Sequence, residues 1–178
     1  MKKFCNLLTI IFVVLSGSAA GQKGIGMKTV QNFSIEQFMG TWYEIARFPH
    51  SFERNLVGVT ATYRLKENGN VEVINQGHKN DLDGKVKRAK AFAKIPDTNE
   101  PRRLKVFFFW PFGADYLILD LDPNYQWVLV GSSSPKFLWI LSRTPQMVPE
   151  QYSAIVNKAR GLGYNIDKLE VIPQKETL

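Results

Sequence analysis

Residues that could act as nucleophiles, general bases or metal ligands are scarce in this sequence. Cys5 is the only cysteine, and His50 and His78 are the only histidines. Nucleophilic catalysis needs a base within hydrogen-bond reach of the nucleophile, and a metal site needs several ligands at suitable spacing. Neither histidine has such a partner pattern nearby, and His50 is expected in a loop after the first strand. We therefore expect no catalytic residues, no metal site and no cofactor.

Two charged segments have simpler explanations than a binding site. Asp81-x-Asp83-Gly84 places carboxylates two residues apart, as calcium loops do, but its composition favours a hairpin turn. The basic stretch from Lys85 to Lys90 is typical of the solvated face of an alternating strand, so it does not predict nucleic-acid binding. No nucleic-acid partner is expected.

The N-terminus has the composition of an export signal. Lys2 and Lys3 precede an apolar run, Leu7–Leu15, and Ser18-Ala19-Ala20 supplies the small residues that signal peptidase needs. This run is shorter than the about 20 residues that span a bilayer. Cys5 lies before the run and not at the cleavage point, so we expect neither a lipid anchor nor a disulfide in the exported chain. A soluble protein of the periplasm, or otherwise of the cell envelope, is predicted.

The predicted division is a signal peptide over residues 1–20 and a single domain over residues 21–178, which is long enough for one core. Removing the signal takes away two lysines and no acid, so the formal charge of +7 falls by two. Such a moderate basic excess fits a solvated surface of mixed charge, and it also fits transient contact with an anionic membrane surface. Both interpretations stay open.

Strand-like runs separated by turn residues dominate the rest of the sequence. They cover residues 41–47, 56–65, 70–79, 85–94, 103–109, 115–121, 126–131 and 137–143. The short spacing between them favours antiparallel hairpins. Ser34–Gln37 predicts a capping box and a short helical turn, Pro149 opens an amphipathic helix that should pack on the sheet, and Ile166–Ile172 alternates as a last strand.

Two segments a hundred residues apart carry a specific resemblance. Gly40-x-Trp42, Asp122-x-x-Tyr125 and Arg143 match three motifs of the lipocalin family, and the chain most resembles bacterial lipocalins related to apolipoprotein D. The resemblance implies an all-β fold, an eight-stranded antiparallel up-and-down β-barrel with a C-terminal α-helix packed outside. It also implies that Arg143 packs over Trp42 and closes one barrel end, where stacking is worth about 0.5–2 kcal/mol.

The same resemblance implies a function. It points to non-catalytic binding, storage or transport of a small hydrophobic ligand in the cell envelope, with a fatty acid or lysophospholipid as the favoured ligand. The alternative is a stress-linked lipid scavenger, or an enzyme acting on oxidised lipids held in the barrel. A lipid is therefore the expected partner, and the chain is expected to be a monomer or a homodimer.

Strand alternation, aligned by the resemblance, predicts which residues face the barrel interior. Small residues such as Ala89 and Ala91 favour an open cavity, although large side chains opposite could fill it. Tyr63 and Asn75 could bond a ligand head group or satisfy a buried neighbour. Glu44 and Leu119 are also expected inside. The predicted ligand-binding residues are Ala46, Tyr63, Val73, Asn75, Ala91, Val106, Phe108, Leu117 and Trp139.

The aromatic segment Phe107–Phe112 is expected to form the hairpin between the fifth and sixth strands at the open mouth. There it could contact a membrane, the ligand or another subunit, or its side chains could pack into the barrel wall. The exposure of these side chains decides between the alternatives.

Overall fold

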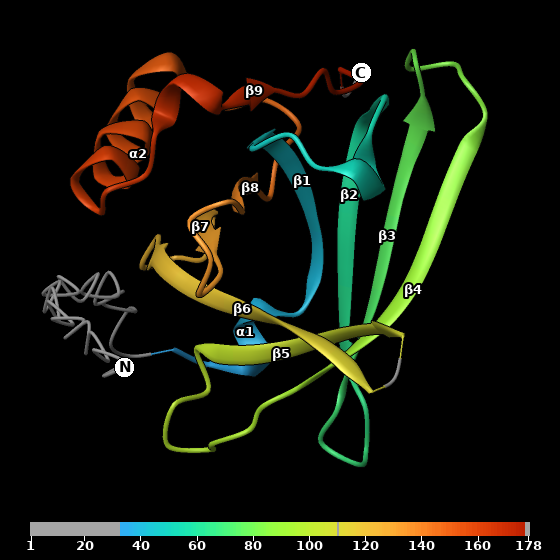
Figure 1. Cartoon of the computed structure of the whole chain (residues 1–178), viewed down its shortest axis with the longest axis vertical. Helices are drawn as coiled ribbons and strands as arrows, with labels where there is room; N and C mark the ends of the chain where they lie inside the picture. Colours follow the sequence, from blue (N-terminus) through green and yellow to red (C-terminus); the bar gives the residue numbers. More distant parts are fainter. Residues whose placement is uncertain (1–32, 110, 177–178) are drawn as a thin grey trace, which may run out of the picture.

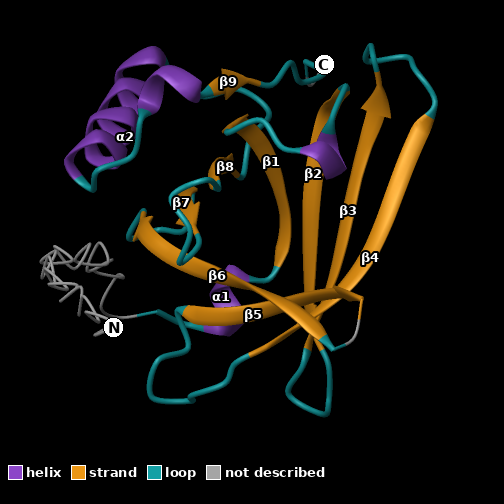
Figure 2. Ribbon diagram, viewed as in Figure 1, coloured by secondary structure: helices purple, strands orange, loops and turns teal. Residues whose placement is uncertain are grey.

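A computed structural model of the chain describes residues 33–109 and 111–176. The predicted signal peptide and Cys5 lie outside the described residues. Figures 1 and 2 show strands wrapped around a central space, with one long helix on the outside. The strands are β1 Gly40–Arg47, β2 Leu56–Leu65, β3 Val71–Lys79, β4 Val86–Lys94, β5 Arg103–Phe109, β6 Phe112–Leu121, β7 Trp127–Gly131, β8 Leu138–Ser142 and β9 Glu170–Val171.

Antiparallel pairing of sequence neighbours closes β1–β8 into a barrel. The order is β2-β3-β4-β5-β6-β7-β8-β1, and β1 also pairs with β2, which completes the ring. The predicted eight-stranded up-and-down barrel is thereby confirmed. In this topology the connections alternate between the two ends, so the β1–β2, β3–β4, β5–β6 and β7–β8 loops share one end.

The helices are short except for one. They are α1 Ile35–Phe38, α2 Pro149–Gly161 and the 3₁₀ turns η1 Ser51–Glu53 and η2 Ile166–Lys168. Ser34 caps α1 by accepting from the Gln37 amide, which is one half of the predicted capping box, while the Ser34 amide donates to the Tyr125 hydroxyl instead of to the Gln37 side chain. In α2, Pro149 occupies the first turn, and Ile155 and Ala159 are buried against the barrel.

The last predicted strand is mostly wrong. Residues Ile166–Lys168 form η2, and only Glu170–Val171 pairs, as β9, with the end of β1. The cause is local, because the Asn165 side chain accepts from the Asp167 amide and its carbonyl accepts from Lys168. An Asn side chain that bonds the backbone ahead of it favours a turn over an extended strand.

Two apolar clusters divide the core. The inner cluster, inside the barrel, contains Trp42, Tyr63, Val73 and Val106. The outer cluster packs the barrel wall against α2. It contains Ala46, Leu117 and Leu119, so the prediction that these three residues face inward is wrong.

The two errors have different physical causes. On β1, the register with β8 shifts between Glu44 and Ala46, which breaks the strict alternation of faces. On β6, both faces are apolar because α2 covers the outside, so hydrophobicity alone cannot distinguish them. Tyr116 and Ile118 belong to the inner cluster in place of Leu117 and Leu119.

The closed end of the barrel gathers the three motifs. The Arg143 guanidinium lies 3.8 Å from the Trp42 ring centroid. It donates to five backbone carbonyls, those of Gln37, Phe38, Met39, Thr41 and Tyr125. The Asp122 carboxylate holds the turn through the Asn124 and Gln126 amides, and the Tyr125 hydroxyl accepts from the Ser34 amide.

Gly40 is required at this end for two reasons. Its φ of +98° lies in the left-handed region, and a β-carbon there would come 3.1 Å from the Arg143 Nη1 atom. A side chain would therefore strain the backbone and push the guanidinium from its position over Trp42. The Gly-x-Trp spacing therefore places a residue without a side chain, Gly40, where Arg143 crosses β1.

Candidate functional site

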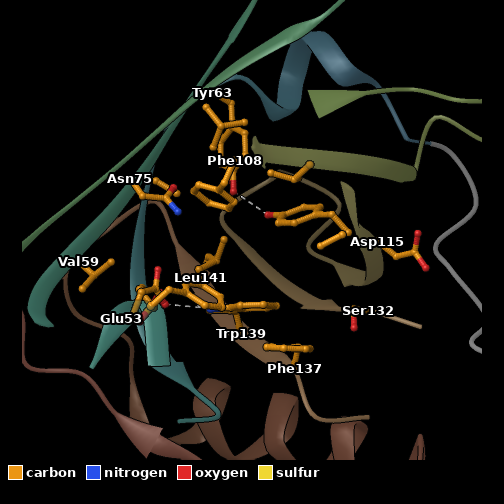
Figure 3. A pocket seen from close by; sticks show the side chains of 17 residues that line it. Glu53, Val59, Tyr63, Asn75, Phe108, Asp115, Ser132, Phe137, Trp139 and Leu141 are labelled. Carbon is orange, nitrogen blue, oxygen red and sulfur yellow. Dashed lines mark hydrogen bonds between the residues drawn. The ribbon is translucent and has the colours of Figure 1, made fainter. Parts of the chain in front are cut away.

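A cavity of about 160 Å³ lies inside the barrel above the closed end. The lower barrel is filled, because the buried Phe38 ring packs 5.0 Å from Trp42 and 5.2 Å from Tyr63 between centroids. Above these rings the inner wall carries small aliphatic residues, among them Val59, Ala61, Val73 and Val106. The cavity is therefore mostly apolar and has a solid floor, and Figure 3 shows the side chains that line it.

Six of the nine predicted ligand-binding residues line this cavity. They are Tyr63, Val73, Asn75, Val106, Phe108 and Trp139. Ala46 and Leu117 lie in the outer cluster instead. Ala91 packs against the inner cluster without lining the cavity. Sequence reasoning missed Phe52, Glu53, Ala114, Asp115, Tyr116, Ser132 and Phe137, several of which come from loops that strand alternation does not cover.

A second cavity, of about 460 Å³, adjoins the first at the mouth. The two share Phe52, Glu53, Val59, Asn75 and Phe108. The second cavity is also lined by Lys87 and Arg88, which lie near the start of β4. β4 pairs with β5 only near its other end, through Phe92–Lys94. Together the cavities fall within the size of small-molecule sites, about 300–1,000 Å³.

Two phenols meet inside the cavity. The Tyr63 and Tyr116 hydroxyls lie 2.8 Å apart, and burial raises the pKa of both above the ordinary value. Both groups therefore stay protonated at neutral pH, and the hydroxyl that accepts in this bond keeps its own proton for a ligand. The Asn75 Oδ1 atom, also buried, has no hydrogen-bond partner among the described residues.

A buried ionic cluster forms the wall near the mouth. Arg47 Nη1 lies 2.5 Å from Glu44 Oε1, and both side chains are almost fully buried. Arg47 Nη2 donates to the backbone carbonyls of Glu53 and Leu56 at 2.8 and 3.2 Å. This cluster holds the β1–β2 loop, including η1, against the first strand.

The Glu53 carboxylate completes this wall. Its Oε2 atom lies 2.9 Å from His50 Nε2 and accepts from the Trp139 indole at 3.4 Å. The His50 contact is close but not aligned as a hydrogen bond, because neither ring nitrogen of His50 has a well-directed partner. His50 is in the loop after β1, as predicted, stacked on Phe52 at 3.8 Å between centroids.

Burial raises the pKa of Glu44 well above its ordinary value of 4.5, and the neighbouring Glu53 raises it further while Arg47 opposes both effects. Above pH 4.5 the folded chain therefore holds a proton that the unfolded chain has released. Stability must fall as the pH rises from 4.5 through the raised pKa of Glu44.

We expect Glu44→Gln to flatten this pH dependence. Urea unfolding at about pH 5 and about pH 8 should show a smaller loss of unfolding free energy in the variant than in the wild type. Glu72→Gln is the control, because Glu72 pairs with Arg64 and Lys66 in a more exposed site and its loss should keep the slope. An unchanged slope in Glu44→Gln would show that another group titrates.

The aromatic residues of the predicted mouth hairpin lie in different environments, some buried and some exposed. Phe107 is buried and stacks on Phe92 with centroids 5.0 Å apart, which fits packing into the wall. Phe108 lines the cavity at 37% exposure, and Phe112 is 80% exposed. Phe52, at 55% exposure, lies 6.2 Å from Phe108 and extends this apolar rim.

No helix within the described ranges is long and apolar enough to cross a membrane. The same part of the chain contains no group of three or more histidine, cysteine or acidic residues arranged to hold a metal ion.

Comparisons with known proteins agree with this architecture. Residues 33–174 match the family described as a lipocalin-like domain. The chain is 40% identical over 164 residues to the outer membrane lipoprotein Blc of Citrobacter freundii, covering 91% of this chain and 90% of that protein. It is 34% identical over 151 residues to apolipoprotein D of Bos taurus, covering 81% and 78%.

A solved structure shows the same fold at lower identity. The cockroach allergen Per a 4 superposes with a TM-score of 0.63 at 20% identity, covering 83% of this chain and 93% of the allergen. The family match spans both the closed end and the cavity. By its sequence, its barrel and these relatives, the chain belongs to the lipocalin family, whose members bind small hydrophobic molecules.

Proposed function

We propose that this lipocalin is a non-catalytic carrier or store for a single-chain lipid, with a fatty acid or a lysophospholipid as the favoured ligand. The observation that carries this proposal is the mostly apolar cavity above a filled floor, whose polar groups are Asn75, the tyrosine pair and the side chains near the mouth. One end admits an alkyl chain, and the other is closed by Arg143 and Trp42.

The energetics suit such a ligand. Each buried CH₂ contributes about 0.8 kcal/mol at best, and immobilising the chain reduces this gain. Apart from Asn75 and the tyrosine pair, the wall offers only aliphatic and aromatic contacts along the alkyl chain. Affinity would therefore grow with chain length until the cavity is full, and the head group would decide selectivity.

The setting of this function is also proposed. Residues 1–20 would direct export, and cleavage after Ala20 would leave a soluble periplasmic protein or one otherwise in the cell envelope. Two of the exposed rim residues, Phe52 and Phe112, would give the mouth transient contact with a membrane surface during loading. A homodimer through the same rim is the competing use of this surface.

The direct test is native mass spectrometry of protein purified from the envelope, followed by identification of the released molecule. A single-chain lipid mass supports the carrier function. A lipid that leaves chemically altered would favour the alternative, an enzyme or scavenger acting on oxidised lipids, and a consistently empty barrel would contradict stable storage.

Replacing Trp139 with alanine tests the assigned cavity. The indole lines the cavity and packs against the inner cluster, so we expect single-chain lipid affinity to fall about ten-fold through lost apolar contact, without unfolding the barrel. Trp127→Ala is the matched control, because Trp127 packs in the outer cluster beside α2 and its loss should leave affinity unchanged. Titration calorimetry measures both, and equal affinities would remove Trp139 from the binding site.

A further inference from the structure

Two carboxylates and one guanidinium lie near the mouth of the smaller cavity. Glu44 and Glu53 both line the cavity, and their side chains are 4% and 7% exposed. The Arg47 guanidinium donates to the Glu44 carboxylate and to two backbone carbonyls, and it does not pair with the Glu53 carboxylate. No lysine or arginine of the described part of the chain lines this cavity, and the Glu53 carboxylate instead contacts His50 Nε2 at 2.9 Å and the Trp139 indole at 3.4 Å.

An aromatic cluster lies beside this carboxylate. Trp139 donates its indole N–H to Glu53 and stacks on Phe137, with centroids 5.9 Å apart and planes inclined by 8°. The Phe52 ring lies 6.3 Å from the Phe137 ring between centroids and lines the same cavity. Figure 3 shows Glu53, Trp139 and Phe137 grouped at one end of the cavity, away from Tyr63. Ring faces beside a poorly solvated carboxylate attract cations, and exclusion of water strengthens both attractions.

We infer that Glu53, with the rings of Phe52, Phe137 and Trp139, forms a head-group subsite for the ammonium group of a single-chain amphiphile. The alkyl chain would lie against the aliphatic wall toward the tyrosine pair. This inference rests on the proposed function, because it assumes that the cavity holds such a chain. It adds a charge preference for an organic cation over an anion.

Further features of the cavity agree with a cationic or hydrogen-donating head group. The unpartnered Asn75 Oδ1 atom is an acceptor that an N–H or O–H group of the ligand could satisfy. Lys87 and Arg88 line only the adjoining larger cavity, where the phosphate of a zwitterionic head group would find its partner.

A charge series with one alkyl chain tests the subsite. Calorimetric titration with decyltrimethylammonium, decyl sulfate and decanol, each below its micelle concentration, compares a cation, an anion and a neutral head. We expect the cation to bind at least about ten-fold tighter than the anion. The net positive charge of the protein favours the anion, so it cannot produce this preference.

Variants locate the preference. Glu53→Gln should lower affinity for the cation about ten-fold while leaving decanol affinity unchanged. Asp115→Asn is the matched control, because Asp115 also lines the cavity but its carboxylate lies 3.9 Å from Lys105. Phe137→Leu keeps an apolar side chain and removes a ring face, so it should lower affinity for the cation selectively. This variant tests the subsite if Glu53→Gln fails to fold.

The outcomes separate the two proposals. If all three amphiphiles bind without preference for the cation, or if the preference survives in Glu53→Gln, the subsite is overturned and the carrier function stands. If none of the three binds, the carrier function fails, and the subsite fails with it.

Discussion

Replacing Arg143 with alanine is expected to lower the free energy of unfolding by about 3–4 kcal/mol, the sum of a cation–π contact and charged hydrogen bonds at the barrel base. The guanidinium stacks on the fully buried Trp42 and joins α1, β1 and the β6–β7 turn through five carbonyls. Its loss would remove the guanidinium donor from these carbonyls and weaken the attachment of α1, which the buried Phe38 ring and the Trp42 indole bond to the Phe38 carbonyl would still hold. Urea unfolding measures the change.

Companion variants separate geometry from charge. Arg143→Lys keeps the positive charge but not the planar fork, so we expect it to recover less than half of the lost stability. Arg160→Ala is the control, because Arg160 is exposed on α2 and bonds only the Asn157 side chain among the bonds identified for it. Lipid affinity of folded Arg143→Ala should stay near wild type, since the cavity lies above the base. A stability loss below about 1 kcal/mol would mean that ring packing alone closes this end.

Arg47→Met should be the other severely destabilising change, by about 3–5 kcal/mol near neutral pH. Methionine fills similar space but leaves Glu44 without its buried cation and the Glu53 and Leu56 carbonyls without their donor. The loss should shrink at about pH 5, because Glu44 can then take up a proton and need no counter-ion. Urea unfolding at both pH values measures this difference.

An exposed pair provides the control for burial. Arg64 lies 3.6 Å from Glu72 with its side chain 62% exposed, so Arg64→Met should change stability by less than about 0.5 kcal/mol. The double variant Glu44→Gln/Arg47→Met should be more stable than Arg47→Met alone, because it removes the uncompensated charge. Equal losses in the buried and exposed variants would contradict the assigned role of the Glu44–Arg47 pair.

Predictions from the sequence succeeded where one local pattern had one structural solution. Turn residues between alternating runs located the eight barrel strands to within a few residues, and Pro149 with helical spacing located α2. The tail failed because Ile166–Ile172 alternates like a strand, while Asn165 directs a turn through bonds to the next residues. Short-range hydrogen bonding overrode the apolar pattern there.

The cavity was harder to predict than the barrel. Tyr63, Val73 and Asn75 lie on β2 and β3, where the faces differ in polarity or size and alternation continues through these residues. Ala46 was misplaced by the register shift on β1, and Leu117 by a strand that is apolar on both faces. Tyr116 could have been predicted to face the interior. It precedes Leu117 in a strand that is apolar on both faces, and a buried tyrosine hydroxyl needs a hydrogen-bond partner.

The sequence by itself determined the strands and the helix of the barrel, because period and turn chemistry are local features, and the resemblance of Gly40-x-Trp42 and Arg143 to family motifs identified the residues of its closed end. Only the tertiary structure decided what faces the cavity mouth. Glu53 and Phe52 come from η1 and Phe137 from the β7–β8 loop, and no strand period applies to them. Packing of Arg47 against Glu44 and the loop carbonyls brings these distant residues together, and buried charge and ring contacts then define the chemistry of the site.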